Sequence, residues 1–106
     1  MDRRTFPRIT LQLPVAFRGA GVRGRALVTS LSRRGCTIAM GRAADFPEYL
    51  ELTIALPDLS EPVKTGAAIR WRSDATFGVE YLILTRSDEG ALARFVETLR
   101  IEQAQR

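Results

Sequence analysis

The segment Ser30-Leu31-Ser32-Arg33-Arg34-Gly35 reads as a sharp reversal between two β-strands. Two hydroxyl groups and two guanidinium groups gather where the chain turns. Gly35 is the residue expected to accept a positive φ there, because it has no Cβ. The other dense group of basic residues is the N-terminal stretch Arg3-Arg4-Thr5-Phe6-Pro7-Arg8. We expect this arm to fold back onto the turn, so that the two together hold one anionic ligand.

Apolar and polar residues alternate on both sides of this turn, which is typical of half-buried strands. The alternation recurs along six segments, near residues 10–18, 23–29, 36–40, 50–56, 61–71 and 77–81. Pro14 interrupts the first segment and requires an edge or a bulge, and Gly19-Ala20-Gly21 indicates a turn after it. Since only turns or short loops join these strands, the pattern favours an antiparallel barrel or sandwich over a parallel α/β fold.

Only the C-terminal segment changes to the period of a helix. Its apolar stripe, spaced i, i+3, i+4 and i+7, consists of Leu92, Phe95, Val96 and Leu99. Ser87 is the expected N-cap, with Asp88 and Glu89 in the first turn, where the helix dipole favours acids. We expect this helix to close one mouth of the barrel and to fray through Glu102–Arg106.

The length and amino-acid composition of the chain limit how many domains it can form and which kinds of site it can contain. With 106 residues it forms one domain, which we divide into an arm at 1–9, a barrel at 10–84 and a helix at 85–103. It has no histidine and a single cysteine, Cys36, so a zinc cluster, a Ser/His pair and an internal disulfide are not expected. No apolar run approaches the ~20 residues that cross a bilayer. We therefore expect a cytoplasmic, non-enzymatic protein that needs no metal or cofactor and does not insert into membranes.

Positive charge is concentrated in the first part of the chain. Residues 1–42 contain nine arginines against the single acid Asp2, whereas residues 43–106 contain seven Lys or Arg against eleven Asp or Glu. Lys64 is the only lysine. Arginine suits planar recognition of phosphate and of guanine edges, so the asymmetry points to an anionic partner.

These motifs, in this order, resemble the PilZ domain family. The family pattern begins with Arg-x-x-x-Arg, here Arg4-Thr5-Phe6-Pro7-Arg8 with Arg3 as an additional arginine. It continues with Asp or Asn followed by x-Ser-x-x-Gly, here Ser30 to Gly35 with serine in the first place. Ile69-Arg70-Trp71 and Gly78-Val79-Glu80-Tyr81 also look like the fifth and sixth strands of the family.

The resemblance implies a six-stranded antiparallel β-barrel with a C-terminal helix that binds cyclic di-GMP, a bacterial second messenger, and signals through an effector protein. Carried over by position, the ligand-binding residues are Arg3, Arg4, Arg8, Ser30, Ser32 and Gly35. Ser30 has a shorter reach than Asp or Asn, which predicts a weakened contact to the base at that position. Arg33 and Arg34 are either solvated turn residues or further phosphate contacts, and Trp71 is either barrel packing or a stacking platform.

Two other functions remain open from the sequence. Ser30 is compatible with a degenerate PilZ-like domain that does not bind the nucleotide and acts through protein contacts alone. The basic N-terminal part is compatible with a small barrel that binds single-stranded nucleic acid. Polymeric nucleic acid is the least favoured partner, because Phe6 is the only aromatic residue of that part that reads as exposed.

Overall fold

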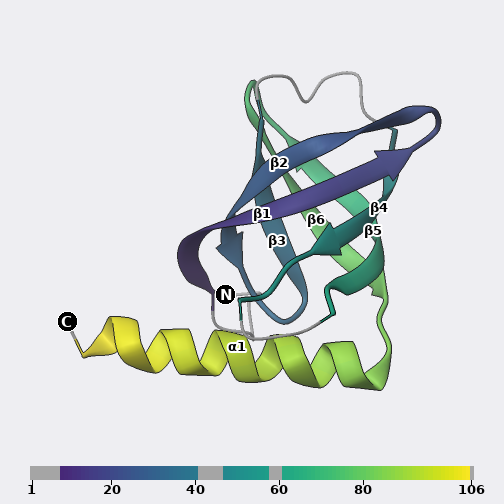
Figure 1. The fold of residues 1–106 in the computed structure, drawn as a ribbon. Coiled ribbons are helices and arrows are strands. Elements are labelled where there is room, and N and C mark those ends of the chain that lie inside the picture. The colour runs from purple at the N-terminus through teal and green to yellow at the C-terminus, as the bar shows by residue number, and fades with distance from the viewer. Residues whose placement is uncertain (1–7, 41–46, 58–60, 106) are drawn as a thin grey trace.

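The computed structural model describes residues 8–40, 47–57 and 61–105, which form six strands and one helix. Their bounds are β1 Ile9–Gly19, β2 Val22–Leu31, β3 Gly35–Ala39, β4 Tyr49–Ile54, β5 Val63–Arg72, β6 Thr76–Ile83 and α1 Arg86–Ala104. The strands close into a barrel in the order β1-β2-β3-β6-β5-β4, and every neighbouring pair is antiparallel (Figure 1). The predicted six-stranded antiparallel barrel with a C-terminal helix is confirmed.

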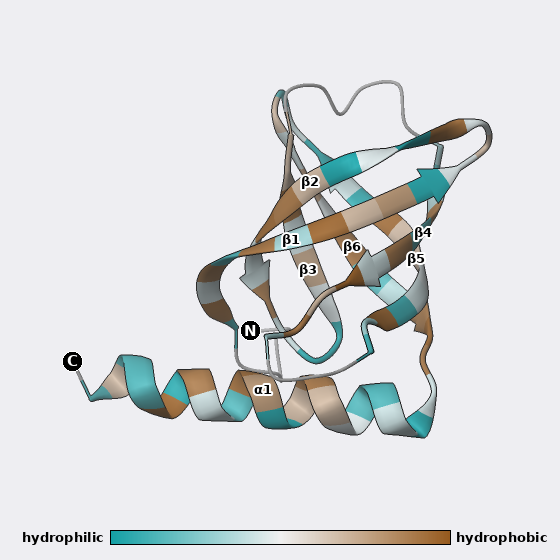
Figure 2. Cartoon of the chain, viewed as in Figure 1, coloured by the Kyte–Doolittle hydropathy of each residue, from teal (hydrophilic) through white to brown (hydrophobic). Residues whose placement is uncertain are grey.

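The core fills the inside of the barrel because alternate residues of each strand point inward. Along β1 the buried positions are Ile9, Leu13, Val15 and Phe17. Val28, Ile38, Ile54, Val63 and Phe77 from the other five strands are completely buried. Burying such side chains stabilises the fold by about 1.5–3 kcal/mol each. The outward positions between them are mostly polar, as the alternating colours of the strands in Figure 2 show.

The hairpin between β1 and β2 turns within two residues. Gly19 pairs with Val22, and Ala20 and Gly21 both have positive φ, 48° and 83°. Two left-handed residues are what a tight hairpin requires if its strands are to keep their right-handed twist. Pro14 precedes the ladder that joins β1 to β4, which covers Val15–Arg18. The missing N–H of Pro14 therefore removes no hydrogen bond from the ladder between β1 and β4.

Helix α1 lies across the end of the barrel where β2 turns into β3 (Figure 1). It contributes Ala91, Leu92 and Val96 to the core, and it carries polar residues between its apolar ones (Figure 2). None of the helical residues that the structure describes forms a stretch long and apolar enough to span a membrane.

Two expectations about the ends of this helix are wrong. The N-cap is Thr85, not Ser87: its extended backbone precedes the first turn, and its hydroxyl accepts the Asp88 N–H at 3.0 Å. The helix also continues through the region expected to fray, as far as Ala104. There the Gln103 side-chain amide donates to the Thr10 carbonyl at 2.8 Å, which attaches the last turn to β1.

Candidate functional site

The turn predicted at Ser30–Gly35 is shorter than expected. Ser30 and Leu31 belong to β2 and pair with Thr37 and Cys36 of β3, while Gly35 is already the first residue of β3. Only residues 32–34 connect the two strands. The sequence predicts Ser30 and Ser32 in one turn, but they occupy different positions. Ser30 is on the surface of β2, and Ser32 is buried inside the connection.

Ser32 organises the connection from within. It is buried, with 3% of its surface exposed. Its Oγ accepts the backbone N–H groups of Arg34 at 3.1 Å and Gly35 at 3.2 Å, and its hydroxyl and its backbone N–H both lie within hydrogen-bonding distance of the Gly35 carbonyl. A serine that satisfies the backbone groups following it is a common way to stabilise a tight turn. Ser32 therefore fixes the shape of the connection.

Gly35 is required for a different reason from the one predicted. Among the described glycines only Gly21 has a positive φ, so the expectation of a positive φ at Gly35 is wrong. A Cβ at this position would overlap the backbone carbonyl of Val79 on β6. Next to it, the Tyr81 N–H donates to the Arg34 carbonyl at 2.9 Å. Because Gly35 has no Cβ, the backbone at the start of β3 can pack in direct contact with the backbone of β6.

A β-bulge in β2 brings Ser30 to the outer surface. Val28 pairs with Ile38 and Ser30 with Thr37, so Thr29 is an extra residue in the ladder. Without it, the side chains of Ser30 and Leu31 would each change sides. Because of the bulge, Leu31 returns to the core with no exposed surface, while Ser30 remains accessible. Bulges that re-aim one side chain are common beside functional sites.

Arg8 and Ser30 are in contact. The Arg8 guanidinium donates from Nη1 to the Ser30 Oγ at 3.2 Å, across 22 residues of sequence. The contact is exposed, and a guanidinium carries more N–H donors than the one that this contact uses. The pairing of Ile9 with Leu31 and of Thr10 with Ser30 at the start of β1 places Arg8 beside the second motif. Whether the rest of the arm folds back onto the turn stays a prediction. Arg3 and Arg4 lie outside the described residues.

The secondary candidates lie on both sides of this contact. Arg33 and Arg34 are exposed on the short connection between β2 and β3. Trp71 lies further around the barrel, with 46% of its surface exposed and its indole against Gly78. Strand pairing places Ser30, Thr37, Gly78 and Trp71 in one outward-facing row. The row spans three strand spacings, or about 14 Å.

Beneath this surface Cys36 and Tyr81 form a buried pair. Burial raises the pKa of the Cys36 thiol to about 12. Burial also raises the pKa of Tyr81, and the neighbouring Cys36 raises it further. The Tyr81 hydroxyl lies beside the thiol but has no well-formed hydrogen bond within the part of the chain that the structure describes. Both groups are therefore protonated at neutral pH, and the floor under Arg8 and Ser30 carries no charge.

We expect the Cys36 thiol to resist alkylation in the folded protein. With its pKa raised from 9.0 to about 12, the thiolate fraction at about pH 8 falls by about a thousandfold relative to the unfolded chain, and the thiolate is the reactive form. Alkylation by iodoacetamide, followed by mass spectrometry with and without guanidinium chloride, measures the two rates. Equal rates in the two conditions would show that the thiol is accessible and ordinary.

The sequence as a whole matches one family. The profile of the PilZ domain aligns with residues 2–98. The chain belongs to the PilZ domain family. No curated protein sequence matches it. The predicted resemblance is therefore confirmed over nearly the whole chain, including both stretches that carry the arginine and serine motifs of the PilZ pattern.

Solved structures share the fold of this PilZ domain at low sequence identity. The inhibitor of motility MotI/DgrA from Bacillus subtilis is 20% identical with a TM-score of 0.82; the match covers 96% of this chain and 53% of that one. The PilZ domain of YcgR from Escherichia coli, solved with c-di-GMP, is 15% identical with a TM-score of 0.79, covering 98% and 96%. The PilZ domain of CeSA from a cellulose-synthesizing bacterium is 21% identical with a TM-score of 0.68, covering 89% and 98%. This chain thus spans about half the length of the Bacillus protein.

Proposed function

We propose that this PilZ domain is a non-enzymatic receptor for cyclic di-GMP in bacterial second-messenger signalling. The observation that carries the proposal is the contact between Arg8 and Ser30, which joins the two motifs on one exposed surface. Membership of the PilZ family and the likeness in fold to the c-di-GMP-bound domain of YcgR support the choice of ligand. The site is proposed to work in the cytoplasm and to act on an effector protein.

The proposed ligand is held between the arginine arm and the segment Ser30–Gly35. Arg8 supplies charge-assisted hydrogen bonds to phosphate or to a guanine edge, each contributing about 1.5–3 kcal/mol, and Arg3 and Arg4 of the arm add to them. Ser30 offers its hydroxyl to the base. Ser32 and Gly35 act mainly by holding the connection against β6, since the hydroxyl of Ser32 is already used within the turn.

Arg33, Arg34 and Trp71 extend this proposed surface. The two arginines are exposed beside the Ser32 turn, where they add positive charge to this surface. Trp71 is half exposed in the same outward-facing row as Ser30 and provides an aromatic face for stacking. A dinucleotide with two phosphates and two purine bases has groups that match both kinds of contact.

Isothermal titration of the full chain with cyclic di-GMP tests this function. We expect micromolar affinity, about −8 kcal/mol, and much weaker binding of cyclic di-AMP, because arginine reads the O6 and N7 atoms of guanine. Ser30→Asp should bind as tightly or more tightly, since a carboxylate reaches further toward the base than a hydroxyl. If neither the natural chain nor the Ser30→Asp variant gives a heat of binding, the proposal is overturned.

The alternative is a PilZ domain that has lost its ligand and acts by protein contacts alone. The serine at position 30, where the family pattern has Asp or Asn, favours it. The same titration separates the two functions. Binding by Ser30→Asp but not by the natural chain would establish the alternative, because a single side chain would then restore an otherwise intact site.

A further inference from the structure

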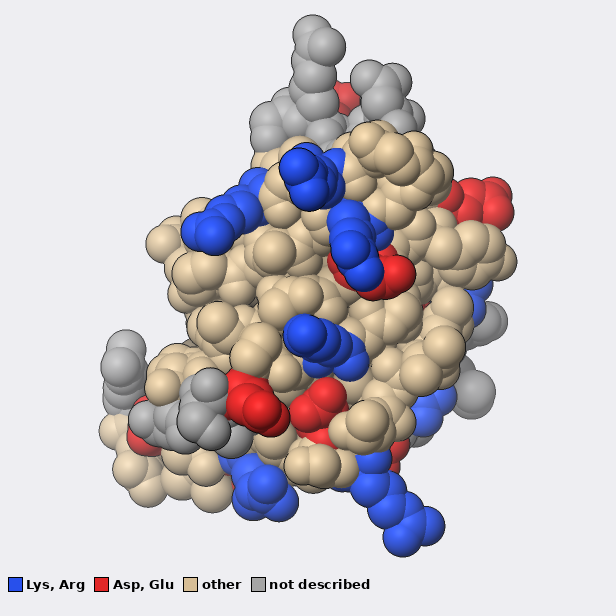
Figure 3. Space-filling model, turned by 45° about the vertical axis from the view of Figure 1, so that its right-hand side comes forward, with Lys and Arg blue, Asp and Glu red and all other residues tan. Residues whose placement is uncertain are grey.

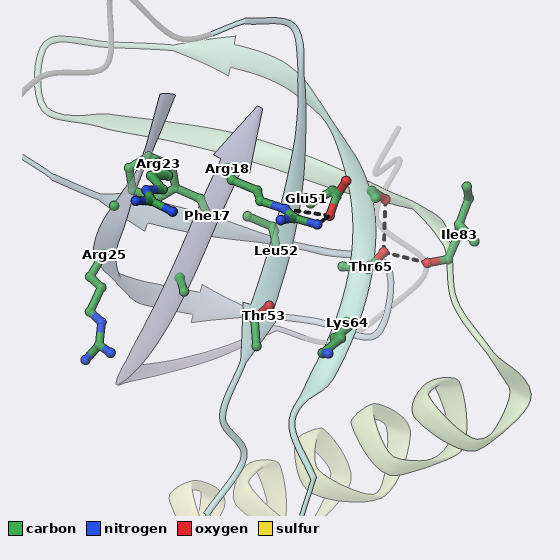
Figure 4. Close-up of a pocket in the computed structure, with 13 residues that line it drawn as sticks. Phe17, Arg18, Arg23, Arg25, Glu51, Leu52, Thr53, Lys64, Thr65 and Ile83 are labelled. Atoms are coloured by element: carbon green, nitrogen blue, oxygen red, sulfur yellow. Dashed lines mark hydrogen bonds and ion pairs between the residues drawn. The ribbon is translucent and has the colours of Figure 1, made fainter. Parts of the chain in front are cut away.

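A second surface lies away from the Arg8 and Ser30 contact. It is a hollow of about 900 Å³ that crosses β1, β2, β4 and β5 and ends at the last residue of β6, Ile83 (Figure 4). Its β1 residues, Ala16 to Arg18, lie eight to ten positions beyond Arg8 along the strand, about 30 Å away. The proposed nucleotide site does not use any of these residues.

Strand pairing places the residues of this hollow in two adjacent rows. The first row runs across four strands and consists of Arg25, Ala16, Thr53 and Lys64. The second row consists of Arg23, Arg18, Glu51, Gly66 and Ile83. Each row has cations at its β2 end and small residues in its floor, where another backbone can approach closely. We call this surface the basic groove.

Most of the positive charge in the basic groove is not neutralised. Arg18 forms an ion pair with Glu51 at 2.9 Å, and both side chains are largely exposed. Arg23, Arg25 and Lys64 form no ion pair with a carboxylate within residues 8–40, 47–57 and 61–105. Figure 3 shows basic side chains spread over one face of the molecule, with acidic side chains beside some of them. Asp88 approaches this region, but it accepts a hydrogen bond from the backbone N–H of Lys64 and leaves the ammonium group to solvent.

The shape of the groove selects a class of partner. Arg25 and Lys64 stand on opposite sides of the Thr53 floor (Figure 4), three strand spacings or about 14 Å apart. An extended peptide covers that distance in about four residues. Ile83, 73% exposed, adds an apolar contact at one edge. We propose that the basic groove binds an extended acidic segment of a partner protein, with carboxylates about four residues apart.

Two features argue against nucleic acid in the same groove. Glu51 lies in the middle of the second row and neutralises Arg18, so a phosphate backbone that crosses this point meets no unpaired cation there. The one aromatic residue in the lining, Phe17, is buried and offers no face for stacking bases. A peptide can place its carboxylates beside the arginines and its uncharged residues beside Glu51, which a regularly spaced phosphate chain cannot do.

The test measures the binding of a fluorescein-labelled peptide of about twelve residues. Its glutamates come in pairs that repeat every four residues, with valine and serine between the pairs. Fluorescence anisotropy at about 20 mM and about 150 mM salt gives its affinity for the full chain. We expect Arg23→Glu/Arg25→Glu on β2 and Lys64→Glu on β5 each to weaken binding by about tenfold or more. The matched control is Arg86→Glu/Arg94→Glu on α1, which changes the net charge as much as the double variant and should stay within about twofold.

Other results would overturn the proposal. They are the absence of peptide binding by the natural chain, an equal loss in the α1 control, and tighter binding of a fluorescein-labelled oligothymidine of the same length. Self-association of the natural chain that the groove variants abolish would assign the groove to a second copy instead. Circular dichroism and cyclic di-GMP titration of each variant separate loss of the groove from loss of the fold or of the nucleotide site.

Discussion

Replacing Gly35 with alanine is expected to lower the free energy of unfolding by about 3 kcal/mol or more. The added methyl group would overlap the Val79 carbonyl and approach the Glu80 backbone, so no side-chain rotation can relieve the overlap. Strand β3 would have to move away from β6, and the hydrogen bond from Tyr81 to the Arg34 carbonyl lies at the point of separation. Since domains of this size are stable by only about 5–15 kcal/mol, the loss is a large fraction of the total.

Urea unfolding followed by the fluorescence of Trp71, the only tryptophan, measures this effect. Gly66→Ala is the matched control, because Gly66 is also in a strand and its added Cβ would meet nothing closer than the tip of Ile83 at 3.9 Å. That variant should change stability by less than about 1 kcal/mol. If both variants lose the same stability, the close approach to β6 is not what Gly35 provides.

Replacing Arg8 with alanine is expected to weaken cyclic di-GMP binding by about a hundredfold or more. Two charge-assisted hydrogen bonds from one guanidinium amount to about 3 kcal/mol or more, which is at least two factors of ten in affinity. The fold should survive, because the hydrogen bond from Arg8 to Ser30 that this change removes is exposed. Isothermal titration measures the affinity, and circular dichroism verifies the fold.

Two further variants distinguish a local contact from a general effect of charge. Arg23→Ala removes the same charge from an exposed arginine at the other end of the β1–β2 hairpin, and its binding should remain within about twofold of the natural chain. Arg8→Lys keeps the charge but not the planar pair of donors, so its affinity should fall between the other two. Equal losses in Arg8→Ala and Arg23→Ala would assign the effect to net charge and exclude a contact by Arg8.

Local sequence patterns are sufficient to predict the strands and the helix. Alternation of apolar and polar residues predicts six strands because a strand points successive side chains to opposite sides. The stripe from Leu92 to Leu99 predicts a helix for the corresponding reason, with a period of 3.6. These signals depend only on neighbours in the chain, so the sequence carries them in full.

The exact ends of elements were harder to predict. Thr85 and Ser87 both carry a hydroxyl that can cap a helix, and the choice depends on where β6 releases the chain. Ser30 and Ser32 look equivalent in the sequence, yet the bulge at Thr29 leaves one on the surface while the turn buries the other. Such differences of one or two residues arise from pairing with other strands.

By itself, the sequence determined six strands and a C-terminal helix, which are encoded in local period, and it contains an arginine motif and a serine-glycine motif that resemble those of the PilZ family. Only the tertiary structure decided why Gly35 is needed and where the basic groove forms. Gly35 is constrained by Val79, which is 44 residues away in the sequence, and the groove draws its cations from three strands whose register is set by closure of the barrel. Contacts between residues so far apart depend on which strands become neighbours, and no local pattern specifies that.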